Sequence, residues 1–141
     1  LMQPVDLAGR PVAVEIGGYE ERQIRRINDE QVKAGAKPMD IRTFNTFAES
    51  YQALRAGQVE AVVSVDAVAK FYQDKGEFER AMSGIAGSPA TIAAKSKDLA
   101  QAVLKVMNEM KADGFYDALF DRYGVSKMAG KTLELKGPDL P

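Results

Sequence analysis

The sequence predicts an α/β domain with three layers, in which a mostly parallel β-sheet is flanked by helices. Short β-rich apolar runs alternate with amphipathic segments of helical period three times between residues 11 and 74. Glycine, proline or helix-capping residues stand at most of the junctions between these segments. An alternating strand–helix order implies a parallel sheet with right-handed crossovers. A chain of 141 residues, 45% of them apolar, can bury a core of this kind.

The first half of the chain supplies the strands and helices of this sheet. We expect strands at residues 11–16, 39–44 and 59–65. We expect helices at residues 20–34, from Thr46 to Gly57, and at Asp66–Asp74. Thr46 is expected to be an N-cap with Glu49 completing a capping box, and Asp66 is expected to cap the third helix.

The second half is less regular. A short strand is expected at residues 77–82, a loop at 84–89 and a further strand at 91–95. Ser96 or Asp98 can cap a helix with apolar residues at helical spacing, and a second helix covers residues 115–123. Residues 131–135 are expected to form an edge strand or a frayed tail.

Composition excludes several kinds of chemistry. The chain has no cysteine and no histidine, so thiolate or imidazole metal sites, disulfides and Cys/His nucleophiles are excluded. A net charge of −1 gives no drive toward nucleic acid. We expect no metal site and no cofactor. No apolar run could span a bilayer, no signal peptide is recognised, and a start at Leu1 is expected of a fragment of a longer precursor.

Two strand-to-helix junctions are the candidate binding site. At the first, Gly17, Gly18 and Tyr19 lie between an apolar strand and a charged helix, where backbone N–H groups and the positive helix end can hold an anion. At the second, Asp66 supplies a carboxylate for a cation. In open α/β sheets, ligands bind at the carboxyl ends of the strands. Together the junctions suggest a site for a small zwitterion, although Asp66 also serves as a plain helix cap and Gly17 as a plain turn.

Four segments resemble, in the correct order, bacterial family 3 extracellular solute-binding proteins, the amino-acid-type receptors of ABC importers. Residues 6–20 (Asp-Leu-Ala-Gly-Arg-Pro-Val-Ala-Val-Glu-Ile-Gly-Gly-Tyr-Glu) resemble the start of the second lobe of that family. Residues 53–66 (Ala-Leu-Arg-Ala-Gly-Gln-Val-Glu-Ala-Val-Val-Ser-Val-Asp) resemble its third strand and following aspartate. Residues 88–95 resemble the strand that returns to the first lobe, and residues 113–124 resemble the C-terminal segment.

The resemblance implies a lobe of the type II periplasmic-binding-protein fold and a non-catalytic function. It implies that residues 1–95 form the second lobe and that residues 96–141 are a helical segment that would return to an absent first lobe. Such proteins are periplasmic, close around an amino acid or related carboxylate, and deliver it to the membrane subunits of an ABC importer. In the family, the residues after the first glycine hold the ligand carboxylate and the later aspartate, here Asp66, holds the α-amino group. Gly18 and Tyr19 replace the serine or threonine residues usual at those positions, so the backbone N–H groups would hold the anion.

Two other functions fit the same scaffold. One is a periplasmic enzyme similar to cyclohexadienyl dehydratases, and the other is the ligand-binding sensor domain of a receptor kinase. Without a first lobe, the apolar faces carrying Leu99, Val103 and Met107 would be exposed. Because exposed apolar patches favour association, we expect a dimer or a domain-swapped assembly.

Overall fold

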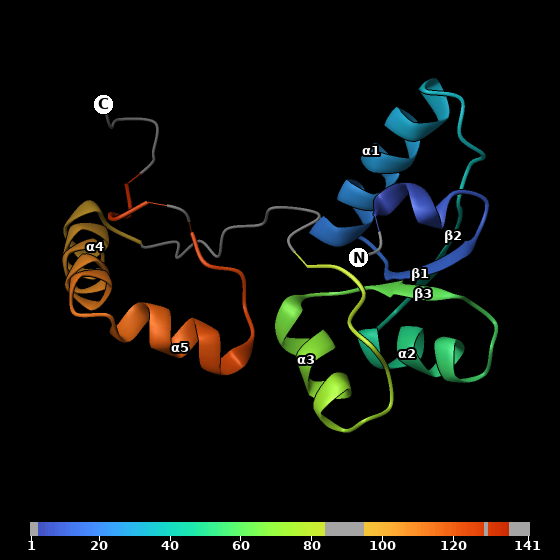
Figure 1. Cartoon of the computed structure of the whole chain (residues 1–141). Helices are drawn as coiled ribbons and strands as arrows, with labels where there is room; N and C mark the ends of the chain where they lie inside the picture. Colours follow the sequence, from blue (N-terminus) through green and yellow to red (C-terminus); the bar gives the residue numbers. More distant parts are fainter. Residues whose placement is uncertain (1–2, 84–94, 129, 136–141) are drawn as a thin grey trace. The chain divides into compact units, whose positions relative to one another are not determined.

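The computed structural model describes residues 3–83, 95–128 and 130–135. The chain divides into two compact units, Leu1–Gly87 and Ser88–Pro141 (Figure 1). The predicted return strand at residues 91–95 and the loop at 84–89 fall almost wholly outside the described residues. The predicted domain boundary between residues 95 and 96 therefore stays a prediction.

The first unit is built on a short parallel sheet. Its elements are η1 (Pro4–Leu7), β1 (Pro11–Glu15), α1 (Tyr19–Lys33), β2 (Asp40–Phe44), α2 (Phe47–Arg55), β3 (Ala61–Val63) and α3 (Asp66–Asp74). The strand order is β2-β1-β3, and β1 pairs in parallel with both neighbours. Val14 lies opposite Thr43 on one side and Val63 on the other.

The central strand supplies both faces of the sheet. Val12, Ala13 and Val14 are all 0% exposed. Val12 and Val14 pack with Ile24 of α1, whereas Ala13 packs with Ala53 of α2. This is the alternation that a pleated strand imposes. Helix α1 and helix α2 accordingly lie on opposite sides of the sheet (Figure 1), which confirms the predicted three-layer α/β class.

The segment at residues 77–82 is not a strand, so that expectation is wrong. Side chains hold it instead. Glu77 forms an ion pair with Arg55 of α2, and the ring of Phe78 lies 5.7 Å from the ring of Tyr51, centroid to centroid. These contacts fix the segment without the backbone ladder that a strand requires.

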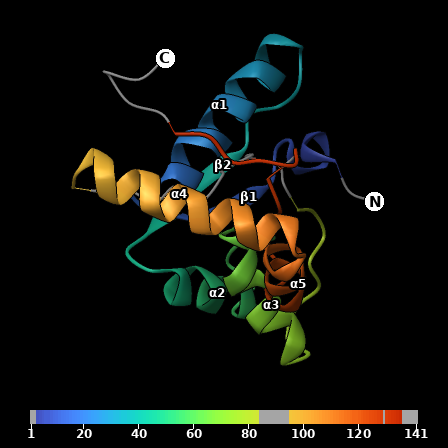
Figure 2. The ribbon, with the colours of Figure 1, turned by 90° about the vertical axis from the view of Figure 1, so that its left-hand side faces the viewer.

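The second unit contains α4 (Lys97–Ala112) and α5 (Phe115–Tyr123), which run in clearly different directions (Figure 2). Ser96 caps α4 by accepting a hydrogen bond from the Leu99 N–H. The side chain of Asn108 donates to the Leu133 carbonyl at 3.3 Å and accepts from the Leu133 N–H at 2.6 Å. Residues 131–135 are therefore tied to α4, and no strand forms there.

We predict that Ile24→Ala lowers the free energy of unfolding by about 2–5 kcal/mol, because it leaves a cavity between α1 and the sheet. Val32→Ala on the same helix removes a side chain that is 41% exposed and should change stability by about 0.5 kcal/mol or less. Urea unfolding followed by circular dichroism measures both. Equal effects of the two variants would contradict the position of the core.

Candidate functional site

The two junctions predicted from the sequence follow neighbouring strands. In the order β2-β1-β3, the chain leaves β1 to form β2 on one side and later returns to form β3 on the other. The carboxyl ends of β1 and β3 therefore flank a switch point, where open α/β sheets bind ligands. Val14 and Val63 are register partners, and Gly17 and Asp66 each follow three residues later. The fold thus brings the ends of these two strands to the same edge.

The glycine turn, residues 17–19, has the conformation that its sequence predicts. Gly17 has a φ of +76°, in the left-handed region that glycine adopts without strain. Gly18 is the N-cap of α1 with an extended backbone, and Tyr19 is the first residue of the helix. The turn therefore presents the N-terminal end of a 15-residue helix at the carboxyl end of β1.

A carboxylate of the chain itself is bound at this turn. The Gly17 N–H donates to Glu21 Oε2 at 2.6 Å. The other oxygen, Oε1, accepts from Arg25, at 2.9 Å from Nε and 2.8 Å from Nη2. The hydrogen bond from Gly17, followed by that from Arg25, lowers the pKa of Glu21. Glu21 is not among the site residues that the sequence predicts. Its position three residues after the N-cap is the signal that could have indicated a bond back to the turn.

A cationic side chain also lies beside the turn. Arg22 Nη1 is 3.4 Å from the Gly17 carbonyl oxygen, and the guanidinium carbon lies 5.9 Å from the centroid of the Tyr19 ring. The aromatic face of Tyr19 thus keeps a positive charge close to the turn.

Asp66 lies one position further into its helix than expected. Val65 is the N-cap of α3 and provides no side-chain cap, and Asp66 is the first helical residue. An acidic residue there is favoured by the positive end of the helix.

Tyr51 and Ser64 support the junction between β3 and α3, and sequence reasoning did not identify either as part of the site. The Tyr51 hydroxyl lies 2.8 Å from Ser64 Oγ, and the ring of Tyr51 stacks on that of Tyr72 of α3 with centroids 3.9 Å apart. Tyr51 is 5% exposed, and burial raises its pKa although the bond to Ser64 opposes the shift. Phe47, Tyr51 and Leu54 have the spacing of one helical face, which predicts that Tyr51 is packed, but nothing local to the sequence pairs it with Ser64.

The N-terminus of α2 lies at the same edge of the sheet and is capped by side chains. The expected capping box differs in one bond, since the Glu49 carboxylate accepts from the Asn45 N–H at 2.9 Å and not from that of Thr46. Glu15, the last residue of β1, accepts from the Phe47 N–H at 3.1 Å. Thr46 accepts from the Glu49 N–H at 3.1 Å, which confirms Thr46 as the N-cap. The carboxylate of Glu15 therefore has a structural partner in α2.

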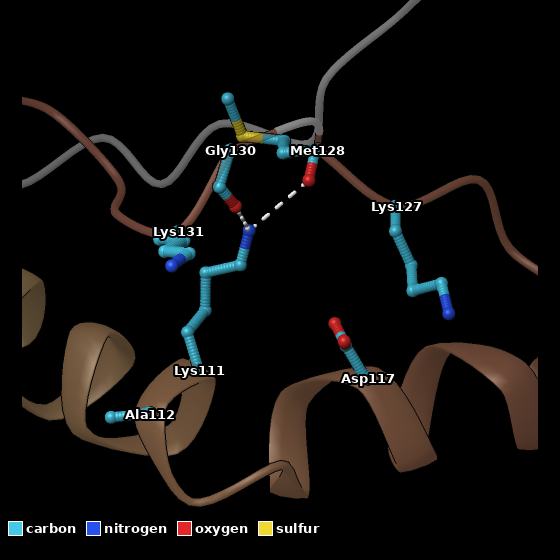
Figure 3. A pocket seen from close by; sticks show the side chains of 7 residues that line it. All are labelled: Lys111, Ala112, Asp117, Lys127, Met128, Gly130 and Lys131. Atoms are coloured by element: carbon cyan, nitrogen blue, oxygen red, sulfur yellow. Dashed lines mark hydrogen bonds between the residues drawn. The ribbon is translucent and has the colours of Figure 1, made fainter.

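A hollow in the second unit has internal contacts among the residues that line it (Figure 3). It is lined by Lys111, Ala112, Asp117, Lys127, Met128, Gly130 and Lys131. The Lys111 ammonium donates to the carbonyl oxygens of Met128 and Gly130 at 3.1 and 2.7 Å. Lys127 pairs with Asp121 at 2.8 Å, and that bond raises the pKa of Lys127. These contacts hold residues 127, 128 and 130 against α4 and α5.

Neither a metal centre nor a membrane span is found in the part of the chain that the structure describes. No group of three or more His, Cys, Asp or Glu residues there could hold a metal ion. No helix among those residues is both long enough and apolar enough to cross a bilayer.

We predict that the contribution of Glu21 to stability depends on pH. Because its folded-state pKa is lowered, that contribution is present above the ordinary glutamate pKa and is lost as the pH falls through the folded-state pKa. The difference in free energy of unfolding between wild type and Glu21→Gln should therefore be largest at neutral pH and shrink below pH 4.5. NMR titration of the Glu21 carboxyl provides the direct check. A midpoint at or above the ordinary glutamate value would contradict the bond, and Arg25→Ala should raise the midpoint only in part.

Comparisons with known proteins give relatives of one kind. No protein-family model matches the chain. A probable histidine-binding protein of Campylobacter jejuni is 28% identical over 123 residues, which cover 84% of this chain and 44% of that protein. The L-cystine-binding protein TcyJ of Escherichia coli is 29% identical over 127 residues, which cover 84% of this chain and 43% of that protein. The chain therefore spans less than half the length of these relatives.

A solved structure with a similar fold is also named for binding an amino acid. An ancestral arginine-binding protein bound to arginine aligns with a TM-score of 0.56 and 26% identity, over 87% of this chain and 54% of that one. The chain is thus similar, over most of its length, to about half of an amino-acid-binding protein, and the resemblance to family 3 solute-binding proteins is confirmed.

Proposed function

We propose that this chain binds an amino acid or a related small carboxylate at the carboxyl ends of β1 and β3. The observation that carries the proposal is the placement of the glycine turn and Asp66 after two neighbouring parallel strands at a switch point. The relatives named for binding histidine, cystine and arginine support the same class of ligand.

The proposed roles follow from charge. The backbone N–H groups of the glycine turn, at the positive end of α1, receive the ligand carboxylate. Asp66 accepts hydrogen bonds from its ammonium group. Because neither Gly18 nor Tyr19 is a serine or threonine, no short hydroxyl side chain follows Gly17, and the backbone N–H groups are the donors that we propose for the carboxylate.

The family resemblance also bears on where the whole protein acts and on its role in transport. On that ground we infer that the whole protein is periplasmic and acts as the non-catalytic receptor that delivers its solute to the membrane subunits of an ABC importer. We expect a bound solute to be recovered unchanged after incubation with the protein. Conversion of a prephenate-like substrate would instead favour an enzyme on the same scaffold.

We predict that Asp66→Asn weakens binding of the preferred amino acid about tenfold or more, because a charge-assisted hydrogen bond becomes a neutral one. Isothermal titration with L-histidine, L-arginine and L-cystine measures the effect. Wild-type binding should be weak, with a dissociation constant of about 1 mM, since one lobe supplies few contacts.

Asp74→Asn is the matched control for this experiment. Asp74 lies at the other end of α3, where it pairs with Lys70 at 2.8 Å. It loses the same charge on the same helix, so affinity should be unchanged. Equal affinities of Asp66→Asn and wild type would remove Asp66 from the site.

We also propose that residues 96–141 pack on a further body, namely the first lobe of the family fold or, without it, a second copy of this chain. No residue of α4 is buried. The side chains of Leu99, Val106, Phe115 and Tyr123 are each more than half exposed. Apolar surface of this kind is normally covered by a partner.

We therefore predict a dimer or domain-swapped assembly by light scattering. The double variant Leu99→Glu/Val106→Glu should be monomeric and remain helical, because both side chains are about half exposed and tolerate charge. A wild-type monomer at concentrations up to about 100 μM, well above those of specific complexes, would contradict the proposal.

A further inference from the structure

We propose that Glu21 is an internal competitor for the ligand carboxylate at Gly17 and thereby sets the affinity of the site. This inference rests on the proposed function. It adds a residue that determines affinity and a mechanism, in which the turn is occupied before the ligand arrives.

The geometry shows an engaged carboxylate. One oxygen of Glu21 accepts from the Gly17 N–H at 2.6 Å and the other accepts from Arg25, so both oxygens have partners. The Glu21 side chain is only 16% exposed, whereas Glu30, the corresponding acid of the Arg26–Glu30 pair on the same helix, is 61% exposed. Glu21 is therefore folded against the turn.

The competition follows from chemistry. The carboxylate of an amino acid and that of Glu21 are the same group, and the Gly17 N–H can make one strong linear bond. A ligand carboxylate at Gly17 must therefore displace Glu21. Arg25 lies one turn further along α1 and can keep its pair with the displaced carboxylate, so Glu21 need not lose all its partners.

A second acidic side chain also opposes the binding of a ligand carboxylate at the turn. Glu20 Oε2 lies 2.9 Å from the position that a Cβ on Gly18 would occupy, so this carboxylate also covers the turn. Arg22 lies at the Gly17 carbonyl and over the Tyr19 ring, so it places a positive charge close to an incoming anion. A ligand carboxylate must therefore compete with the carboxylates of Glu20 and Glu21 for the turn.

The test compares Glu21→Gln with wild type, using L-arginine and L-argininamide as probes at about pH 6, where both α-ammonium groups are protonated. The Gln amide oxygen can still accept from Gly17, which preserves the fold, but a neutral acceptor competes less well. We expect Glu21→Gln to bind L-arginine about tenfold more tightly than wild type does. Affinity for L-argininamide, which has no carboxylate, should not increase.

Glu30→Gln is the matched control. It removes the same charge from the other i,i+4 acid–arginine pair of α1, at the end of the helix remote from the turn, and should leave both affinities unchanged. NMR of the Gly17 amide gives a second readout, since its resonance should move when L-arginine is added.

The outcomes separate this inference from the proposed function. Tighter binding of L-arginine alone by Glu21→Gln supports the competition. Binding of L-arginine at the turn with equal or lower affinity in Glu21→Gln overturns the competition and leaves the proposed site standing. Failure of wild type and both variants to bind L-arginine, L-histidine or L-cystine overturns both.

Discussion

Parallel pairing of β1 between β2 and β3 is the constraint on which the rest of the first unit depends. Val12, Ala13 and Val14 are completely buried because each face of this strand has a helix against it. A strand buried on both faces must be apolar throughout, which the sequence of β1 satisfies until Glu15. Its central place also makes the carboxyl ends of β1 and β3 neighbours.

This constraint gathers the starts of α1, α2 and α3 at one edge, and each start brings N–H groups without helical partners. Side-chain oxygens of the chain itself accept hydrogen bonds at two of these helix starts. Glu21 binds at the turn before α1, and Glu15 and Thr46 cap α2. The turn proposed to bind a ligand anion thus already has the Glu21 carboxylate bound before the ligand arrives. In the proposed mechanism, ligand binding exchanges the Glu21 carboxylate for that of the ligand.

Much of the fold could be predicted from sequence because its signals are local. Glycine after strands, the Thr46 N-cap and helical spacing predicted the three strands and the helices to within about two residues. The failure at residues 77–82 has a different cause, since Glu77 and Phe78 contact Arg55 and Tyr51 of α2, which is distant in sequence. The bond between Tyr51 and Ser64 could not be predicted for the same reason, because it joins α2 to the end of β3. The motifs did lead to the correct class of relatives, whereas the roles of Gly17, Gly18, Tyr19 and Asp66 remain proposals.

The most direct test of the central claim, a ligand site at the carboxyl ends of β1 and β3, is to map amide chemical shifts of the labelled chain during titration with L-arginine, L-histidine or L-cystine. The largest changes should fall at Gly17–Tyr19 and around Asp66, with small changes in α4 and α5. Saturable binding whose shift changes centre on α4, α5 or the hollow around Lys111 would contradict it.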